Sequence, residues 1–320
     1  MRAKKLKTGI VGSGRLGGLF GFALAQRNLC RELVFVDVLP EMAEGQAEDV
    51  LQALALSRLK TRAKFGYEKL KDSDIVILTA GKPRTPEIKS RLELVEINAK
   101  IIANVAREVV KHAPNSILIT VTNPMDVMNY VAFKCSGIPR ERVIGSGGQL
   151  DTARFKLVLS RLYRAPKSKI DAFVIGEHGD AQVPLFSRVK IRGEARSFSD
   201  EEKKRIHEEL RQTALAVITK KKATEFAPVA CTLGMIEAVA RDSKNVLPCS
   251  VVLNGEYGVS DVSIGVPVRL GRGGAEGIEV WDISEEEKNL FLQGAGTLKE
   301  YCAGAEKSIQ ATPPTQSSAP

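Results

Sequence analysis

The chain has 320 residues, of which 43% are hydrophobic and 27% are charged, and its formal net charge is +9. This composition excludes a mainly disordered chain, and the length suits two domains that share an interface. Asp, Lys or Arg interrupts every apolar run before it reaches the roughly 18 residues of a membrane span, so we expect no membrane segment. The basic first residues precede no long apolar stretch, so we expect no secretory signal.

The charge balance and the cysteines indicate the partners and the compartment. The sequence pI is about 9.3, but acidic and basic residues are interleaved, and only five Tyr and one Trp are present for base stacking. We therefore expect attraction of anionic metabolites and no nucleic acid partner. The cysteines form no C-x-x-C pair, which favours reduced thiols in the cytoplasm and no metal site. They are Cys30, Cys135, Cys231, Cys249 and Cys302.

Short apolar runs alternate with helical stretches in the first half of the chain. The runs predict strands at residues 8–11, 33–38, 74–79 and 116–121, each nearly continuous in apolar residues, as in parallel strands buried on both faces. Before the last strand, Ser90 and Glu93 form a capping-box pattern that predicts a helix start. The alternation predicts an α/β fold with a doubly wound (Rossmann) parallel sheet over residues 1–147.

The second half has a different pattern. Helices are predicted at 149–162, 200–221, 225–241 and 284–301, and strands at 170–175, 250–254 and 259–268. This mixture predicts a C-terminal α+β domain over residues 148–303, and it is expected to be the catalytic domain because the candidate catalytic residues named below lie in it. Residues 304–320 are rich in Pro, Ser, Thr and Gln, and we expect a disordered tail there.

A glycine motif follows the first predicted strand. Gly12-Ser13-Gly14-Arg15-Leu16-Gly17 fits G-x-G-x-x-G, in which the glycines permit a tight turn, close approach of a pyrophosphate and helix packing. The start of the following helix supplies N–H donors for phosphate. Asp37 ends the next strand, where an acid binds ribose hydroxyls and repels a 2′-phosphate, so the motif predicts NAD rather than NADP. The alternative is a glycine turn beside a surface aspartate.

Two further segments follow predicted strands, where ligands bind in such sheets. Residues 81–91 form a proline-bearing loop whose arginines, Arg84 and Arg91, are able to close over an anion, although a solvated basic loop is an alternative. Asn123 precedes Pro124, which favours extended geometry and an amide that points into a crevice, although Asn-Pro also marks plain turns.

The candidate proton-transfer residue is one of only three histidines. His112 and His207 have the surroundings of surface residues, whereas His178 lies in a glycine turn after a strand. Asp151 and Arg154 share one helix face at i, i+3 spacing. They form either a simple helix salt bridge or a site in which Asp151 orients a base and Arg154 binds a substrate carboxylate.

Seven segments together resemble the lactate/malate dehydrogenase superfamily, and specifically its lactate-dehydrogenase-like malate dehydrogenase branch. They are GSGRLG, TAGKPR, SRLELVEINAKI, VTNPMDVM, GQLDTARF, IGEHGD and GEYGV, within a resemblance that extends from about Lys7 to Ala303. The resemblance implies an NAD-dependent oxidoreductase of the cytoplasm and the tricarboxylic acid cycle. It also implies a homodimer or homotetramer, in which a small-residue helix segment, Ala43–Ala47, would pack against a neighbouring subunit.

The resemblance implies a role for each matching residue. His178 would donate a proton to the ketone oxygen in reduction and accept it in oxidation, and Asp151 would hold and stabilise its imidazole. Arg154 would bind the carboxylate beside the reacting carbon. The other matching residues are Arg91, which would polarise the carbonyl, Asn123, which would position the substrate oxygen near the nicotinamide, and Asn98 and Val121, which with Asn123 would contact the cofactor.

Arg84 indicates the substrate. At the matching position lactate dehydrogenases carry Gln and malate dehydrogenases carry Arg, and a second carboxylate in a closed site needs a fixed counter-charge. The resemblance therefore implies a dicarboxylate, malate or oxaloacetate. The branch spaces its two loop arginines as R-K-P-G-M-S-R, whereas the segment from Arg84 to Arg91 is one residue longer and contains Glu87.

Two alternatives remain at this point. The longer loop is the reason to keep an L-lactate dehydrogenase, or a dehydrogenase for a bulkier 2-hydroxy acid, as the alternative to a malate dehydrogenase. The net charge of +9 is also compatible with a non-catalytic basic protein that binds NAD or nucleic acid.

Overall fold

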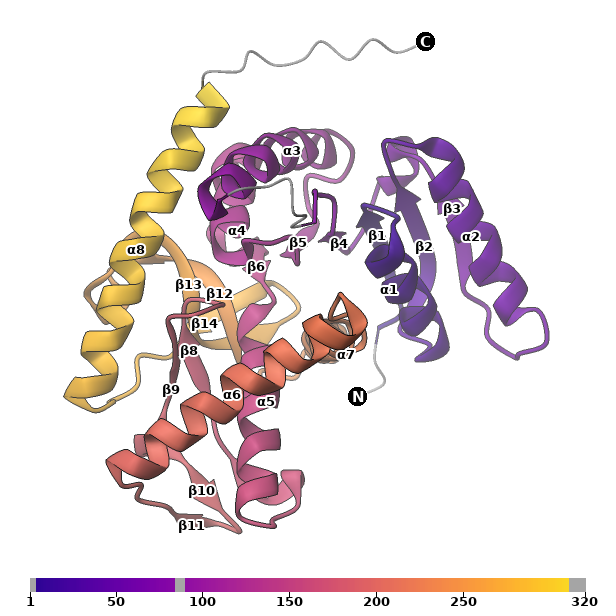
Figure 1. The fold of residues 1–320 in the computed structure, drawn as a ribbon. Coiled ribbons are helices and arrows are strands. Elements are labelled where there is room, and N and C mark those ends of the chain that lie inside the picture. The colour runs from indigo at the N-terminus through magenta and orange to yellow at the C-terminus, as the bar shows by residue number, and fades with distance from the viewer. Residues whose placement is uncertain (1–3, 84–89, 311–320) are drawn as a thin grey trace.

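The computed structural model describes residues 4–83 and 90–310, which are built around one eleven-stranded sheet (Figure 1). Its first part has the strand order β3-β2-β1-β4-β5-β6, with every neighbour parallel. These strands are β1 (Leu6–Val11), β2 (Cys30–Val36), β3 (Arg62–Phe65), β4 (Ile75–Leu78), β5 (Ile117–Thr120) and β6 (Val143–Gly145). The order reverses beside β1, so the doubly wound sheet is confirmed.

Four helices connect these strands. They are α1 (Arg15–Gln26), α2 (Pro40–Leu54), α3 (Arg91–His112) and α4 (Met125–Ser136). α1 packs on α2, and α3 packs on α4, so the two pairs cover different parts of the sheet (Figure 1). β4 and β5 are buried at every position, as is typical of parallel strands in the middle of such a sheet. The Ser90 hydroxyl accepts the Glu93 N–H at 3.0 Å, which confirms the predicted start of α3.

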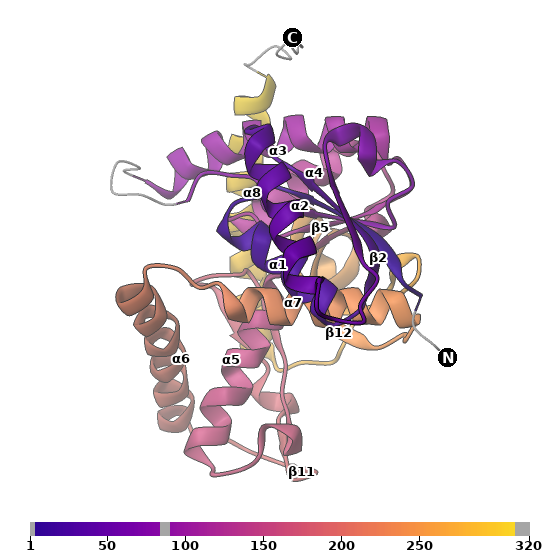
Figure 2. The ribbon, with the colours of Figure 1, turned by 90° about the vertical axis from the view of Figure 1, so that its right-hand side faces the viewer.

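The second part extends the same sheet with antiparallel strands. β12 (Val246–Asn254) pairs with β6 and then with β13 (Ser260–Gly271), which also pairs with β14 (Gly274–Ile278) and β8 (Val174–Gly176); β9 (Gln182–Pro184) follows β8. The helices are α5 (Gly147–Leu162), α6 (Asp200–Lys221), α7 (Phe226–Arg241) and α8 (Glu285–Gln310). The α+β character of this part is confirmed. α5, α6 and the short strand β11 (Glu194–Ala195) form a lobe that extends away from the parallel sheet (Figure 2).

The predicted strand at residues 170–175 is wrong as a single element. β7 (Ile170–Asp171) belongs to a small sheet with β10 (Lys190–Ile191) and β11 (Glu194–Ala195), whereas β8 belongs to the large one. The chain changes sheets at Ala172 and Phe173, which belong to neither strand, and Ile170 packs in a small second core and Ile175 in the main core. The mostly apolar segment IDAFVI does not reveal such a change.

The predicted disordered tail is wrong for residues 304–310. α8 continues to Gln310 and packs against α3 and α4 (Figure 1). Cys302 and Ala305 are buried in this last part of the helix, so small apolar side chains hold it to the fold. Residues 311–320 lie outside the described part of the chain.

None of the described helices is by itself long and apolar enough to cross a membrane. α6 and α7 reach such a length and apolar content only as a pair, and they are bent by 119° relative to each other.

Candidate active site

The three glycines of the first turn are required for three different reasons. Gly12 has φ +100°, and a Cβ there would lie 2.3 Å from the Ala80 nitrogen. A Cβ on Gly17 would lie 2.0 Å from the Gly12 oxygen, so α1 packs directly on the turn. A Cβ on Gly14 would meet no described atom within 4 Å. The open space at Gly14 is therefore a cradle of the kind that a pyrophosphate fills.

Ser13 and Asp37 hold this turn against the end of β2. The Ser13 N–H donates to Asp37 Oδ2 at 2.7 Å, and the buried Ser13 hydroxyl donates to the Val36 oxygen at 3.1 Å. Asp37 is half-buried and also accepts the Leu39 N–H at 3.2 Å. The carboxylate that the sequence assigned to the ribose thus lies beside the glycine turn.

The start of α1 leaves its backbone donors available. Among the described residues, no side chain caps this helix, and its first turn contains no acid. Its N–H groups and its dipole therefore favour an anion at this point. Leu16 packs against the core. Arg15 forms an ion pair at 2.7 Å with Glu225, which lies in the connection between α6 and α7. The cradle, the free helix end and the carboxylate fit a dinucleotide.

These observations predict that one alanine substitution in the turn lowers the stability of the protein and another weakens NADH binding. Gly17→Ala is expected to lower the free energy of unfolding by about 1–3 kcal/mol, because the new methyl group overlaps the turn. Gly14→Ala is expected to leave the melting temperature nearly unchanged but to weaken NADH binding about tenfold or more, because its methyl group occupies the cradle. Thermal melting and fluorescence titration with NADH measure the two effects. Equal NADH affinity of Gly14→Ala and wild type would contradict the assignment.

One buried amide connects the loops that follow β4 and β5. The Asn98 side chain is fully buried; its Oδ1 accepts the Lys82 N–H at 2.8 Å, and its Nδ2 donates to the oxygens of Lys82 at 3.1 Å and of Asn123 at 2.7 Å. Val121 is buried at the end of β5, and Asn123 is exposed beyond it. Asn98 therefore acts on this edge of the sheet by holding both loops.

The structure brings His178 and Asp151 together from separate elements. His178 follows β8, Asp151 lies on α5, and His178 Nδ1 is 2.6 Å from Asp151 Oδ2. Asp151 is buried, and only 16% of the His178 side chain is exposed. Because an ionised carboxylate accepts, it holds the proton on Nδ1 and leaves Nε2 as the atom available for proton transfer.

Burial and charge act in opposite directions on His178. Burial of the imidazole lowers its pKa, but the charge and hydrogen bond of Asp151, supported by the charge of Asp126, outweigh this effect. Arg154 opposes the two acids, and the net result is a pKa of His178 above its usual value. The pair thus favours the protonated imidazole that reduction of a ketone requires.

Arg154 completes the cluster from the same face of α5. Its Nη1 lies 3.4 Å from Asp151 Oδ1, and 18% of its side chain is exposed. This contact is long for a charge-assisted hydrogen bond, so the guanidinium retains donors for a further anion. The simple helix salt bridge is therefore an incomplete description, because Asp151 also binds His178.

The two loop arginines are described only in part. Arg91 is the first residue of α3, but its side chain lies outside the described structure, as does all of Arg84.

Of the two histidines other than His178, His207 is exposed, whereas His112 is half-buried because it stacks on Tyr67 at 5.9 Å.

Sequence reasoning missed two residues that contact His178. A Cβ on Gly147, the first residue of α5, would lie 2.4 Å from His178 Cγ. Asp126 accepts the backbone N–H of His178 at 2.6 Å. The only signals were a glycine pair before a helix and an acid in the first turn of another, and neither pattern is specific.

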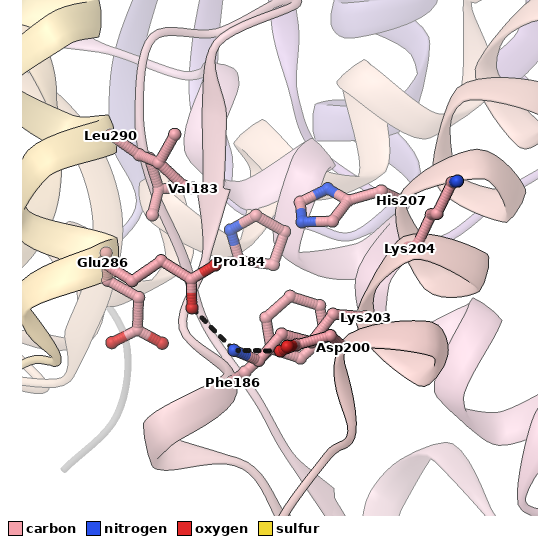
Figure 3. A pocket seen from close by; sticks show the side chains of 10 residues that line it. Val183, Pro184, Phe186, Asp200, Lys203, Lys204, His207, Glu286 and Leu290 are labelled. Carbon is pink, nitrogen blue, oxygen red and sulfur yellow. Dashed lines mark hydrogen bonds and ion pairs between the residues drawn. The ribbon is translucent and has the colours of Figure 1, made fainter.

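A cavity of about 330 Å³ lies elsewhere in the second half of the chain (Figure 3). It is lined by residues of β9, α6 and the start of α8 and is open to solvent, and Lys203 of α6 pairs across it with Glu286 of α8 at 2.6 Å. Its lining contains His207 but neither His178 nor Asp151. Lys203 in its lining already pairs with Glu286 and Asp200. We therefore interpret this cavity as a space between helices and not as the catalytic site.

Comparison with known proteins gives consistent results. Two family descriptions match: "lactate/malate dehydrogenase, NAD binding domain" over residues 6–145 and "lactate/malate dehydrogenase, alpha/beta C-terminal domain" over residues 148–308. Malate dehydrogenase of Haloferax volcanii is 39% identical over 298 residues, which are 92% of this chain and 97% of that protein. L-lactate dehydrogenase 1 of Clostridium acetobutylicum is 37% identical over 306 residues, with 93% and 97% covered.

A solved structure agrees with these matches. The crystal structure of Cryptosporidium parvum malate dehydrogenase superposes with a TM-score of 0.88 at 33% identity and covers 96% of this chain and 100% of that chain. The resemblance inferred from the seven segments is thus confirmed over nearly the whole length. The chain belongs to the lactate/malate dehydrogenase family, as an oxidoreductase whose residues 6–145 are an NAD-binding domain.

Proposed function

We propose that this protein is an NAD-dependent malate dehydrogenase that interconverts (S)-malate and oxaloacetate. The observation that carries the proposal is the contact of 2.6 Å between His178 Nδ1 and Asp151 Oδ2, with Arg154 on the same aspartate. Residues 1–147 would bind the cofactor, and residues 148–303 would contribute these three side chains. The malate dehydrogenases among the relatives support the choice of substrate.

The chemistry divides between the cofactor and the chain. NAD supplies the acceptor or donor of the hydride. In oxaloacetate reduction, Nε2 of protonated His178 gives its proton to the ketone oxygen; in malate oxidation, neutral Nε2 takes the proton from the hydroxyl group. Asp151 keeps the other proton on Nδ1 in both directions and stabilises the imidazolium. Arg154 binds the carboxylate beside the reacting carbon through its remaining donors.

The other site residues complete the proposed substrate contacts. Arg91 would polarise the carbonyl, Asn123 would position the substrate oxygen, and Arg84 would pair with the second carboxylate. Gly12, Ser13, Gly14, Arg15, Leu16, Gly17, Asp37, Asn98, Val121 and Asn123 would form the cofactor site. The turn and Asp37 support this set by their hydrogen bonds, and Asn98 supports it by holding the two loops.

One assay panel tests the substrate and the cofactor together. We expect oxaloacetate to exceed pyruvate in kcat/KM, and NADH to exceed NADPH, because Arg84 offers a counter-charge and Asp37 repels a 2′-phosphate. In Arg84→Gln, the preference for oxaloacetate over pyruvate is expected to fall about a hundredfold, because a buried carboxylate loses its partner. A wild-type enzyme that prefers pyruvate would instead identify an L-lactate dehydrogenase, as the Clostridium relative is named.

We further propose that the protein is a cytoplasmic homodimer or homotetramer that serves the tricarboxylic acid cycle. All five cysteines are free, which fits a reducing compartment. Ala43 and Ala47 of the small-residue segment are buried within the chain itself, whereas Glu44 and Gly45 between them are exposed, so a subunit contact of this helix would be made by its exposed residues. Exposed Met42 and Leu51 on the same helix are better candidates for such a contact. Light scattering after size exclusion measures the oligomeric state.

A further inference from the structure

Asp126 is a buried acid next to the proposed catalytic histidine, and the mechanism above does not use it. It lies in the first turn of α4, within VTNPMDVM, and is 2% exposed. A buried carboxylate is costly unless several donors satisfy it, so its partners indicate its role.

Within the described residues, two donors bind the Asp126 carboxylate, one from the segment after β8 and one from β12. Its Oδ2 accepts the His178 backbone N–H at 2.6 Å, and its Oδ1 accepts the Ser250 hydroxyl of β12 at 2.6 Å. The hydroxyls of Ser250 and Ser263 are 2.8 Å apart, and Asn129 Nδ2 donates to Ser263 Oγ at 2.9 Å. Because the Ser250 proton points to Asp126, Ser263 must donate to Ser250. The whole chain of donors thus points toward the carboxylate.

His178 is consequently held by two carboxylates from two helices. Asp151 of α5 binds its ring, and Asp126 of α4 binds its backbone. Two further charged groups of the described chain act on His178 and Asp126: Arg154 of α5 opposes protonation of His178, and Glu177 raises the pKa of Asp126. Cys302 of α8 also lies near Asp126, and its buried thiol stays protonated.

We propose that Asp126 is a positioning residue for His178, which fixes the backbone of residue 178 and places a second negative charge near its imidazole. The proposal rests on the acid/base role proposed for His178. Burial raises the pKa of Asp126 to about 6, although the Ser250 and His178 hydrogen bonds lower it, so the carboxylate is charged above that pH. There its charge raises the pKa of His178, and its removal lowers that pKa.

Asp126→Asn tests the proposal because the asparagine side chain keeps an oxygen that accepts the His178 backbone N–H but carries no charge. The protein contains only three histidines, so NMR of ¹³C-labelled imidazoles follows each titration, and His178→Asn assigns the relevant signal. We expect the His178 pKa to fall by about 0.5–1 unit, and the alkaline limb of kcat/KM for oxaloacetate reduction to move by the same amount, a loss of about threefold to tenfold above it.

The outcomes separate this proposal from the function on which it rests. An unshifted His178 titration in Asp126→Asn, even with a lowered melting temperature, would show that Asp126 is merely structural and would overturn the proposal. A wild-type protein without dehydrogenase activity refutes the proposed function, whereas the NMR titration still tests the coupling. If Asp126→Asn does not fold, Ser250→Ala replaces it; the loss of one donor makes Asp126 harder to ionise, so a smaller downward shift supports the proposal and none overturns it.

Discussion

His178→Asn is expected to lower kcat for oxaloacetate reduction by about a hundredfold or more, with NADH affinity nearly unchanged. Asparagine carries no proton that it can transfer near neutral pH, so the ketone oxygen would develop negative charge without a donor. The glycine turn and Asp37 lie on other elements, so the cofactor site does not depend on residue 178. Stopped-flow kinetics and fluorescence titration with NADH measure the two quantities.

The stability of this variant provides a control. Asp151 is buried, and its contact of 2.6 Å with His178 is lost, so a lower melting temperature is expected as well. Rates must therefore be measured well below the melting transition. A variant that is folded, binds NADH and retains near-wild-type turnover would show that His178 is not the proton donor.

Gly147→Ala is expected to lower kcat at least tenfold although residue 147 would touch no substrate. The added methyl group would lie 2.4 Å from His178 Cγ, 2.6 Å from its Cβ and 2.7 Å from Met125 Cε, so the imidazole must move. Displacement of a catalytic group by about 1 Å can cost on the order of a hundredfold. Steady-state kinetics in both directions measures the loss.

A matched substitution separates displacement of His178 from a general loss of stability. Gly296→Ala on α8 adds the same methyl group where no described atom lies within 4 Å, and it is expected to retain full activity. If Gly147→Ala keeps wild-type kcat, the close approach of α5 to His178 has no functional importance.

The sequence predicted the elements that depend on local pattern. The apolar runs located β1, β2, β4 and β5, and the Ser90–Glu93 pair located the start of α3. The exposed strand β3 has no such run, since its four residues alternate between charged and apolar, and it was missed. The change of sheet between Ile170 and Ile175 was missed because both residues are buried, in different cores.

The candidate site shows the same division. The glycines, His178 and Asp151 belong to short motifs whose residue types are tied to their chemistry, so they were proposed from the chain alone, and the structure places His178 and Asp151 in contact. Asp126 and Gly147 act only through tertiary contacts with His178, and their spacing in the sequence carries no trace of that contact. The burial of Ala43 and Ala47 was likewise set by packing and not by composition.

The hydrogen bonds of Asn98 have a consequence for substrate preference. They fasten Lys82 at one end of the segment that carries Arg84, and the Ser90 cap fastens the other end. When hydrogen bonds hold both ends of a loop, insertions within the loop leave the flanking strand and helix in place. Under the proposed function, a change in the length or sequence of this segment would alter substrate preference without moving His178 and Asp151, which lie on other elements.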